Sequence, residues 1–379
     1  MAGIFINRSD WEKFSESEMD EYRESVFAYY RAHGFPYFRT DDDWRRDEFR
    51  KFMEFDDSDV ISGDEIRQTM HGLSFCWSFM PHAYSVQCNG FMSPYEAFMD
   101  DDTLRSVIRK RTMMGDNMSD NGLRKMLKIH TGVQGVSNFR PTAASAIYAK
   151  FAKGKVVWDM SAGYGGRMLG AFKAGVRKYI GTDPCTPTYD GLMEMTDFIR
   201  SCNSELLVPY DGCEMELHRI GSEEFVPDCN VDFCFTSPPY FDTEKYSDED
   251  TQSWKRYGNR EGWLDGFLKQ TILNCRSCLV GNGVMAINIA NVRSYPTMEE
   301  DTVRTAVENG FEHVRTMKYL LSSLSTKSVY KFEPVFMFRR KILKSRMSRC
   351  MDWRMRFWHL DLHSGLILTQ TRYPTRSLF

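Results

Sequence analysis

The chain has 379 residues, of which 42% are hydrophobic and 14% aromatic, so it can bury a substantial core and is not a disordered protein. No run of about 18 uncharged apolar residues occurs, which argues against a membrane span. The first residues, MAGIFINRSDWEKF, lack the basic and apolar blocks of a signal peptide. The ten cysteines are scattered, with a single C-x-x-C at Cys275 and Cys278, so we expect reduced cysteines, no metal site and a cytoplasmic location.

The net charge of −3 hides two oppositely charged ends. Residues 1–70 hold 18 Asp or Glu against 10 Lys or Arg, whereas residues 339–379 hold 10 Lys or Arg against 2 Asp. The basic end also contains Trp353, Phe357 and Trp358. Such a tail can follow a phosphate backbone, and it can equally dock as a terminal helix on the acidic N-terminal part. Overall charge therefore does not identify a nucleic-acid-binding protein.

The spacing of apolar residues divides the chain into three parts. Residues 1–130 are acidic, aromatic-rich and mostly helical in period, which predicts a separate, mainly helical region. Between 131 and 340, short apolar runs alternate with amphipathic segments, which is typical of a doubly wound, mostly parallel α/β sheet covered by helices on both faces. Its expected strands lie at 155–160, 178–184, 231–236, 283–292, 317–321 and 331–340, and its expected helices at 167–175, 263–280 and 302–310. Residues 341–379 form the basic tail.

A glycine-rich turn follows the first expected strand. WDMSAGYGGRMLGAF places Asp159 at the strand end, and Gly163, Gly165 and Gly166 at the start of a helix. Such a turn lets backbone N–H groups approach a ligand closely. The next strand ends in Asp183, where an acid is positioned to bind a ribose diol. Because the third glycine of a dinucleotide-binding motif is absent, the pattern favours a mononucleoside-like ligand over NAD.

A second corner is predicted at VDFCFTSPPYF, residues 231–241. Pro238 and Pro239 remove two backbone donors and fix two φ angles, so neither a helix nor a strand continues through them. By itself this stretch is equally typical of an ordinary strand-terminating turn. In a doubly wound sheet, however, ligands bind at the carboxyl ends of the strands where the strand order reverses. If the strand at 231–236 neighbours the first strand, Ser237 lies beside the glycine turn.

In this order the two motifs resemble those of the amino-group DNA methyltransferases, which methylate N4 of cytosine or N6 of adenine with S-adenosylmethionine. In that family a glycine-rich turn binds the cofactor, and an (Asp/Asn/Ser)-Pro-Pro-(Tyr/Phe) corner holds the flipped base. The resemblance covers roughly residues 137–340. It includes SNFRPTAASAIYAKFA (137–152), which is similar to the family's extra cofactor-binding segment. It also includes GSEEF (221–225), where the family usually has an acid or amide near the adenine of the cofactor.

The chain departs from the family pattern at two places. Met160 and Ser161 replace the family's Pro-Phe before the glycines. The segment between Gly166 and Ser237 is filled by the expected strands and helices, which leaves no room for an inserted target-recognition domain. Sequence recognition then falls to residues 1–130 or to the tail, or it is weak.

The resemblance implies a set of site residues. The cofactor-binding residues would be Phe139, Arg140, Pro141, Thr142, Asp159, Ser161, Ala162, Gly163, Gly165, Gly166, Asp183, Ser222 (or its neighbour Glu223) and Thr236. The catalytic residues would be Ser237, Pro238, Pro239 and Tyr240. The polar loop at 242–263 would close over cofactor and base, or else be a plain solvated loop. The substrate contacts would be Phe241, Tyr246, Trp254, Lys255, Arg256 and Arg260.

The chemistry implied is attack of a base amine on a sulfonium methyl. The Ser237 hydroxyl and the Pro238 carbonyl would accept the amine protons and free the nitrogen lone pair, while Tyr240 stacks on the flipped base. The family's Ser variant favours cytosine over adenine, and double-stranded DNA is the expected partner, as in restriction-modification. Three alternatives stay open: an RNA base as substrate, transfer of a group other than methyl, or a non-catalytic nucleic-acid- or partner-binding module. The expected cytoplasmic location also agrees with a nucleoid-associated protein or with a virus-encoded protein in a host cell.

Overall fold

The computed structural model describes residues 8–204, 212–321 and 331–341. The described residues up to Arg340 belong to one compact unit. The basic tail predicted from residue 341, and the SSLSTKSVY segment between the last two strands, fall almost entirely outside the described residues. Within the described part no helix is long and apolar enough to cross a membrane.

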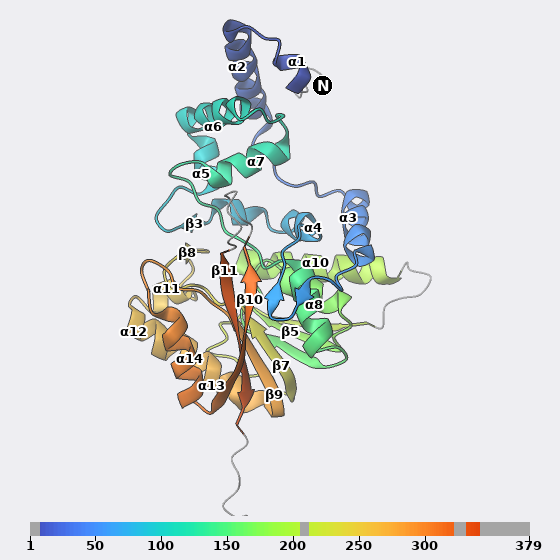
Figure 1. Ribbon diagram of the computed structural model, residues 1–379, viewed down its shortest axis with the longest axis vertical. Coiled ribbons are helices and arrows are strands. Elements are labelled where there is room, and N and C mark those ends of the chain that lie inside the picture. Colours follow the sequence, from blue (N-terminus) through green and yellow to red (C-terminus); the bar gives the residue numbers. More distant parts are fainter. Residues whose placement is uncertain (1–7, 205–211, 322–330, 342–379) are drawn as a thin grey trace, which may run out of the picture. The chain divides into compact units, whose positions relative to one another are not determined.

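The core of the fold is a twisted sheet in which nine strands are described, in the order β1-β2-β10-β11-β9-β7-β4-β5-β6 (Figure 1). Its strands are β1 (Ile61–Ser62), β2 (Glu65–Ile66), β4 (Val156–Asp159), β5 (Lys178–Thr182), β6 (Glu214–His218), β7 (Val231–Thr236), β9 (Leu279–Asn288), β10 (Phe311–Leu320) and β11 (Phe332–Arg340). The five strands from β6 to β9 pair in parallel, whereas β11 runs antiparallel between β9 and β10. From β4 the chain adds β5 and β6 on one side, then crosses to β7 and β9 on the other. The strand order therefore reverses between β4 and β7, which confirms the predicted doubly wound, mostly parallel sheet.

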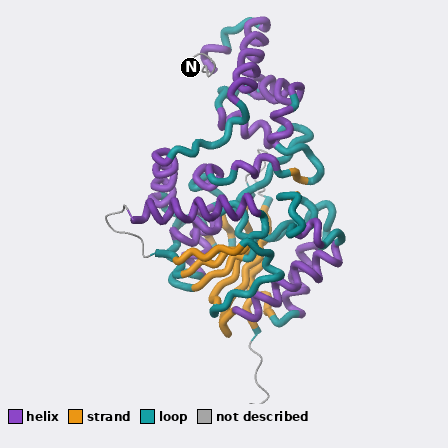
Figure 2. The backbone as a smooth tube through the Cα atoms, turned by 180° about the vertical axis from the view of Figure 1, so that it is seen from behind, coloured by secondary structure: helices purple, strands orange, loops and turns teal. Residues whose placement is uncertain are grey.

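Helices cover both faces of this sheet (Figure 2). One face packs against α8 (Pro141–Phe151), α9 (Gly166–Lys173) and α10 (Thr186–Ser204), and the other against a π-helical turn η2 (Trp263–Leu268), α13 (Lys269–Cys278) and α14 (Met298–Glu308). In β7, Phe233 and Phe235 face the first layer, and Cys234 faces the second. This alternation follows from the two-residue period of a strand, and the residues are apolar on both sides because both faces are covered.

The N-terminal region is mainly helical, as predicted. Its elements are α1 (Arg8–Trp11), α2 (Glu16–His33), α3 (Asp42–Glu54), α4 (Leu73–Ser78), the 3-10 turn η1 (Pro81–Ser85), α5 (Pro94–Met99), α6 (Asp101–Met113) and α7 (Asp120–Ile129). The helices α1, α2, α5, α6 and α7 bury their own cluster, which includes Val26 and Leu104. Phe52 of α3 and Phe75 of α4 instead belong to the core of the sheet. This part of the N-terminal region thus shares one hydrophobic core with the domain predicted at 131–340.

Several element boundaries differ from the sequence expectation. The strand expected from residue 283 begins at Leu279, because that residue pairs with Val231 of β7. The strand expected from residue 317 begins at Phe311, opposite Arg340 of β11. In both cases the extra length comes from ladder partners far away in sequence, which a local pattern does not contain. The sequence reading also omitted β6 and α10.

Candidate functional site

The two predicted corners leave the same edge of the sheet. The parallel strands β4 and β7 are direct neighbours, with Val157 opposite Phe233 and Trp158 opposite Cys234. Both strands end within a few residues of this register, and the AGYGG turn follows the first while the Ser-Pro-Pro-Tyr corner follows the second. The sheet therefore brings together two motifs that are about 70 residues apart in the chain.

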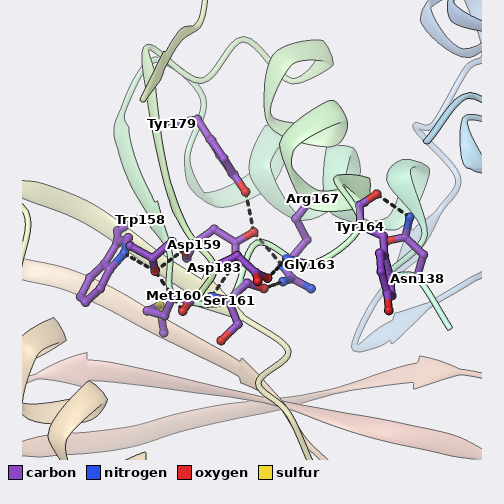
Figure 3. Close-up of polar contacts among 11 residues, drawn as sticks. Asn138, Trp158, Asp159, Met160, Ser161, Gly163, Tyr164, Arg167, Tyr179 and Asp183 are labelled. Carbon is purple, nitrogen blue, oxygen red and sulfur yellow. Dashed lines mark hydrogen bonds and ion pairs between the residues drawn. The ribbon is translucent and has the colours of Figure 1, made fainter. Parts of the chain in front are cut away.

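The glycine turn needs its glycines for two different reasons. Gly163 and Gly165 have φ values of +56° and +77°, the left-handed region that residues with a Cβ rarely adopt. Gly166 has an ordinary φ, but a Cβ there would lie 2.0 Å from the carbonyl oxygen of Phe139. The side chain of Asn138 also donates a hydrogen bond to the Tyr164 carbonyl at 2.9 Å (Figure 3). The Asn138–Pro141 segment is thus packed directly onto the glycine turn.

Asp183 is joined to the glycine turn by its carboxylate. It accepts hydrogen bonds from the backbone amide of Gly163 and from that of Cys185, both at 3.0 Å. Burial raises the pKa of Asp183 to about 6, although these two amides pull it down. The acid after β5 is therefore fixed beside the turn, and with a pKa of about 6 it is mostly ionised at neutral pH.

Asp159 has a different role in the structure from that of Asp183. Its side chain is fully buried, and the Oδ2 atom accepts from the Arg167 guanidinium at 2.9 Å and from the Tyr179 hydroxyl at 2.7 Å (Figure 3). Arg167 also donates to the carbonyl of Ser161. A buried ion pair of this kind leaves an uncompensated charge if one partner is removed. Through Arg167 and Tyr179, Asp159 therefore connects the end of β4 to β5 and to the glycine turn.

The Ser-Pro-Pro-Tyr corner is supported by the neighbouring strands β9 and β11. The Tyr240 hydroxyl lies 3.4 Å from the carbonyl of Asn288 and 3.3 Å from the carboxylate of Glu333. Burial raises the pKa of Tyr240 well above its usual range, and the Glu333 carboxylate adds to this, while a hydrogen bond with Ser237 acts the other way. The hydroxyl thus fixes the ring of Tyr240 next to Ser237.

The chain reverses direction sharply just after the corner. The amide of Phe241 donates to the Pro239 carbonyl at 3.0 Å, and Phe241 has a φ of +56°. A bulky residue rarely takes this conformation, and it is maintained here because the Phe241 ring is buried against Trp263 and Tyr295. The strained turn therefore sets the direction in which the following loop leaves the corner.

The segment before α8 lies behind the glycine turn. The Phe139 ring stacks on Tyr319 of β10 at 4.7 Å, and the Tyr319 hydroxyl accepts from the Arg140 amide at 3.1 Å. Pro141 occupies the first turn of α8, where its missing N–H costs nothing. Thr142 is buried and shares a 2.8 Å hydrogen bond with Thr69 of the N-terminal region.

Residues 242–263, which we call the covering loop, cross the ends of β5 and β6. Glu249 accepts a hydrogen bond from the Thr186 amide at 2.9 Å, at the start of α10. Arg256 forms an ion pair of 2.8 Å with Glu224, in the turn after β6. The loop also contains α11 (Ser253–Arg256), α12 (Arg260–Gly262) and β8 (Glu244–Lys245). The covering loop is thus tied down over the strand ends that carry Asp183.

The other predicted site residues have varied surroundings. Ser222 is buried, and its hydroxyl pairs with Thr271 of α13 at 2.8 Å. The amide of Ala162 donates to the Thr182 carbonyl at 2.9 Å, and the Thr236 hydroxyl is buried without a partner in the described part of the chain.

The predicted substrate contacts of the covering loop are held by neighbouring side chains and backbone. The ring of Tyr246 meets that of Tyr164 edge-on, and the Trp254 indole donates to the Ser247 carbonyl. Lys255 pairs with Asp250, and Arg260 lies over the Tyr295 ring. Their cofactor and substrate roles stay predictions.

Four residues at this edge were absent from the sequence-based set: Tyr164, Arg167, Glu244 and Glu333. Arg167 is a charged residue directly before the apolar run of α9, and Glu333 is an acid between the apolar residues at the start of β11. Both are departures from the expected pattern that sequence reasoning can detect. Glu244 stands in a polar loop, where nothing in the local sequence distinguishes it from its acidic neighbours.

No family model matches the sequence, and no curated protein sequence matches it. A magnesium protoporphyrin IX methyltransferase from Synechocystis with bound SAM is one similar solved structure, with 14% identity, a TM-score of 0.36, and coverage of 62% of this chain and 90% of that chain. A TehB-like SAM-dependent methyltransferase from Corynebacterium glutamicum has 13% identity, a TM-score of 0.36, and coverage of 54% of this chain and 90% of that chain. A ribosomal protein L11 methylase from Lactobacillus delbrueckii has 14% identity, a TM-score of 0.36, and coverage of 55% of this chain and 81% of that chain. Likenesses of this size say nothing about substrate. The strand order of this chain is itself that of a doubly wound, Rossmann-like sheet with helices on both faces.

Proposed function

We propose that this protein transfers the methyl group of S-adenosylmethionine to an exocyclic base amine in DNA, with N4 of cytosine favoured over N6 of adenine. The observation that carries the proposal is the pairing of β4 with β7. This pairing brings a nucleoside-binding type of turn and an acceptor-bearing corner to one edge of the sheet, at the point where the strand order reverses.

The residues around the glycine turn fit a nucleoside cofactor. Gly163 and Gly165 provide a turn without side chains, and Asp183 supplies a carboxylate able to accept from two ribose hydroxyls. When bound, S-adenosylmethionine would supply an electrophilic methyl group. The ring of Phe139, which is stacked on Tyr319, and the buried ion pair of Asp159 with Arg167 both support the structure around the turn.

The corner supplies acceptors for the amine. The Ser237 hydroxyl and the Pro238 carbonyl would each accept one amine proton, which localises the nitrogen lone pair for attack in line with the methyl group. The two prolines restrict the backbone, so these acceptors do not have to reorganise during the reaction. Tyr240 offers a ring for stacking on an extruded base, and its hydroxyl bonds to β9 and β11 keep that ring oriented.

The test is a nucleoside analysis of cells that express the full chain. DNA and RNA are isolated separately, digested to nucleosides and compared by mass spectrometry with the same material from cells expressing Ser237→Ala, which leaves both prolines and the glycine turn in place. We expect N4-methylcytosine in DNA from the wild-type cells only. Methylation confined to RNA would transfer the proposal to an RNA substrate. A chain that binds S-adenosylmethionine in calorimetry but modifies neither polymer would contradict base methylation.

A further inference from the structure

One acid of the covering loop is fixed next to the corner by the N-terminal region. Glu244 lies four residues after Tyr240 and pairs with Cys88 in the two-stranded sheet of β3 (Gln87–Cys88) and β8. The next residue of the N-terminal chain, Asn89, donates its amide to the Thr243 carbonyl at 2.7 Å. The backbone at Thr243 and Glu244 is therefore paired with residues 88 and 89 of the N-terminal region, and this part of the covering loop is not a free surface loop.

The carboxylate of Glu244 is incompletely satisfied. Its Oε2 atom is shielded from solvent and has no hydrogen-bond partner within the described ranges. Burial raises the pKa of Glu244 to about 7; the Tyr240 backbone amide pulls it down, and the nearby carboxylates of Glu333 and Asp242 push it up. A buried oxygen of this kind costs free energy unless something donates to it.

A second buried polar group lies close by. Tyr164, in the middle of the AGYGG turn, is 4% exposed, and its hydroxyl has no partner within the described ranges. Burial raises the pKa values of Tyr164 and Tyr246 well above their usual range, and the carboxylates of Asp183 and Glu244 both add to this effect. The rings of Tyr164 and Tyr246 meet edge-on, so the glycine turn and the covering loop are in contact near both acids.

We propose that Glu244 is a catalytic residue of this corner, whose free carboxylate oxygen accepts the proton of the amine that is being methylated. The inference rests on the proposed function and adds a residue to it. Ser237 is an uncharged acceptor, and Glu244 would supply a carboxylate with a free oxygen, whereas the carboxylate of Glu333 already accepts from the Tyr240 hydroxyl. During transfer, positive charge moves from the sulfur to the amine nitrogen, and a carboxylate beside the nitrogen stabilises that movement.

The proposed step balances without any further reagent. The nitrogen lone pair forms the new C–N bond, and the electron pair of the breaking C–S bond stays on sulfur, which becomes a neutral thioether. The nitrogen then carries two hydrogens and a positive charge, and the proton that was hydrogen-bonded to Ser237 leaves that bond and passes to Glu244. The protonated carboxyl returns the proton to solvent after the product leaves. An acid that titrates near the working pH suits such an exchange.

The groups that face Glu244 help to set the pH at which its carboxylate ionises. They are Glu333 of β11, Asp242 and Tyr246 of its own loop, Tyr240 of the corner, Tyr164 of the glycine turn and Cys88 of β3. Only the ionised form of Glu244 can accept a proton. The rate of transfer should therefore rise with pH through about 7 and level off above it, and it should be about tenfold lower at pH 6 than at pH 8.

The experiment compares Glu244→Gln with the wild-type chain from pH 5.5 to 9. Labelled S-adenosylmethionine is the donor, and genomic DNA from cells without DNA methyltransferases is the acceptor. We expect the rate constant at pH 8 to fall about 100-fold, with a flat pH profile and a cofactor affinity within twofold of wild type. Glu261→Gln changes an exposed acid of the same loop and should keep the wild-type rate and profile. Glu244→Asp keeps a carboxylate and should retain the pH-dependent limb at a reduced rate.

The possible outcomes separate the two ideas. A Glu244→Gln chain that transfers methyl groups with the wild-type rate and pH profile would overturn the role of Glu244 and leave the proposed function standing. If the wild-type chain transfers nothing to DNA at any pH, the proposed function fails, and this inference fails with it. Should Glu244→Gln not fold, as judged by its thermal unfolding, a pH-independent rate in Glu244→Asp would equally count against Glu244 as the proton acceptor.

Discussion

The Asp183 carboxylate accepts a hydrogen bond from the backbone amide of Gly163 at 3.0 Å, so the acid after β5 is attached to the turn after β4. The turn adopts a left-handed conformation at Gly163, which directs that amide towards the acid. One interaction thus positions both halves of the proposed cofactor site.

Asp183 should be required for cofactor binding, and in its ionised form. Asp183→Ala should weaken S-adenosylmethionine binding by about 1–3 kcal/mol, because a charge-assisted hydrogen bond is lost. Since the pKa of Asp183 is raised to about 6, wild-type affinity should fall about tenfold between pH 7 and pH 5, and Asp183→Asn should lack that fall. Calorimetric titration at both pH values measures this. Asp190→Ala, an exposed acid of α10, is the control, and equal affinities for all variants would remove Asp183 from the site.

Ser237 should contribute to turnover rather than to cofactor binding. Ser237→Ala removes one acceptor from the target amine and should lower the rate of transfer by about two orders of magnitude, or roughly 3 kcal/mol. Cofactor affinity should hardly change, because the residue faces the base. Ser237→Asp should keep part of the activity, since a carboxylate also accepts. Single-turnover rates with labelled cofactor test both variants, and a Ser237→Ala chain as fast as wild type would refute the role.

Gly166 should be intolerant of even one methyl group. In Gly166→Ala the new Cβ would meet the Phe139 carbonyl oxygen at 2.0 Å, forcing α8 and α9 apart. We expect a loss of about 2–3 kcal/mol in the free energy of unfolding. Gly281→Ala, on β9, has nothing within 4 Å of its Cβ and should change stability by less than about 0.5 kcal/mol. Urea unfolding of both variants gives the comparison. Equal midpoints would show that the turn relaxes without cost.

Glu244 should destabilise the folded chain at neutral pH. Its pKa is raised from 4.5 to about 7 on folding, so the folded state binds more protons than the unfolded state between these values. Stability therefore falls as the pH rises from about 4.5 to 7 and stays lowered above that. Glu244→Gln should be about 1–3 kcal/mol more stable than wild type at pH 8 and nearly equal to it at pH 4.5. Chemical unfolding at the two pH values decides, and a variant less stable at pH 8 would indicate a bound partner for the carboxylate.

The basic end of the chain should add non-specific affinity for nucleic acid. Residues 339–379 carry a net charge of +8, and each Lys or Arg near a phosphate releases counterions on binding. A chain ending at Arg340 should bind duplex DNA more weakly, with a shallower dependence of affinity on salt. Fluorescence anisotropy at several salt concentrations measures the slope. An unchanged slope together with a lowered melting temperature would show that the tail stabilises the fold instead.

The sequence by itself determined most elements of the sheet, though not β6 or α10, and the positions of both corners. The period of apolar residues identifies the parallel strands and their helices, because each period reports a burial pattern within one segment. Glycines that must adopt positive φ, and prolines that prevent β7 from continuing, are likewise local constraints that the residue types themselves reveal.

The tertiary structure alone decided which of these residues meet. The pairing of β4 with β7 brings the two motifs into one site. The sequence lists both Asp159 and Asp183 as cofactor-binding candidates, but only the structure shows that Asp159 forms a buried ion pair with Arg167. Glu244 is distinguished from other loop acids only because β3, more than 150 residues earlier, holds it beside Tyr240. Pairing partners, burial and the resulting pKa shifts depend on contacts between distant segments, and the local pattern around each residue does not encode them.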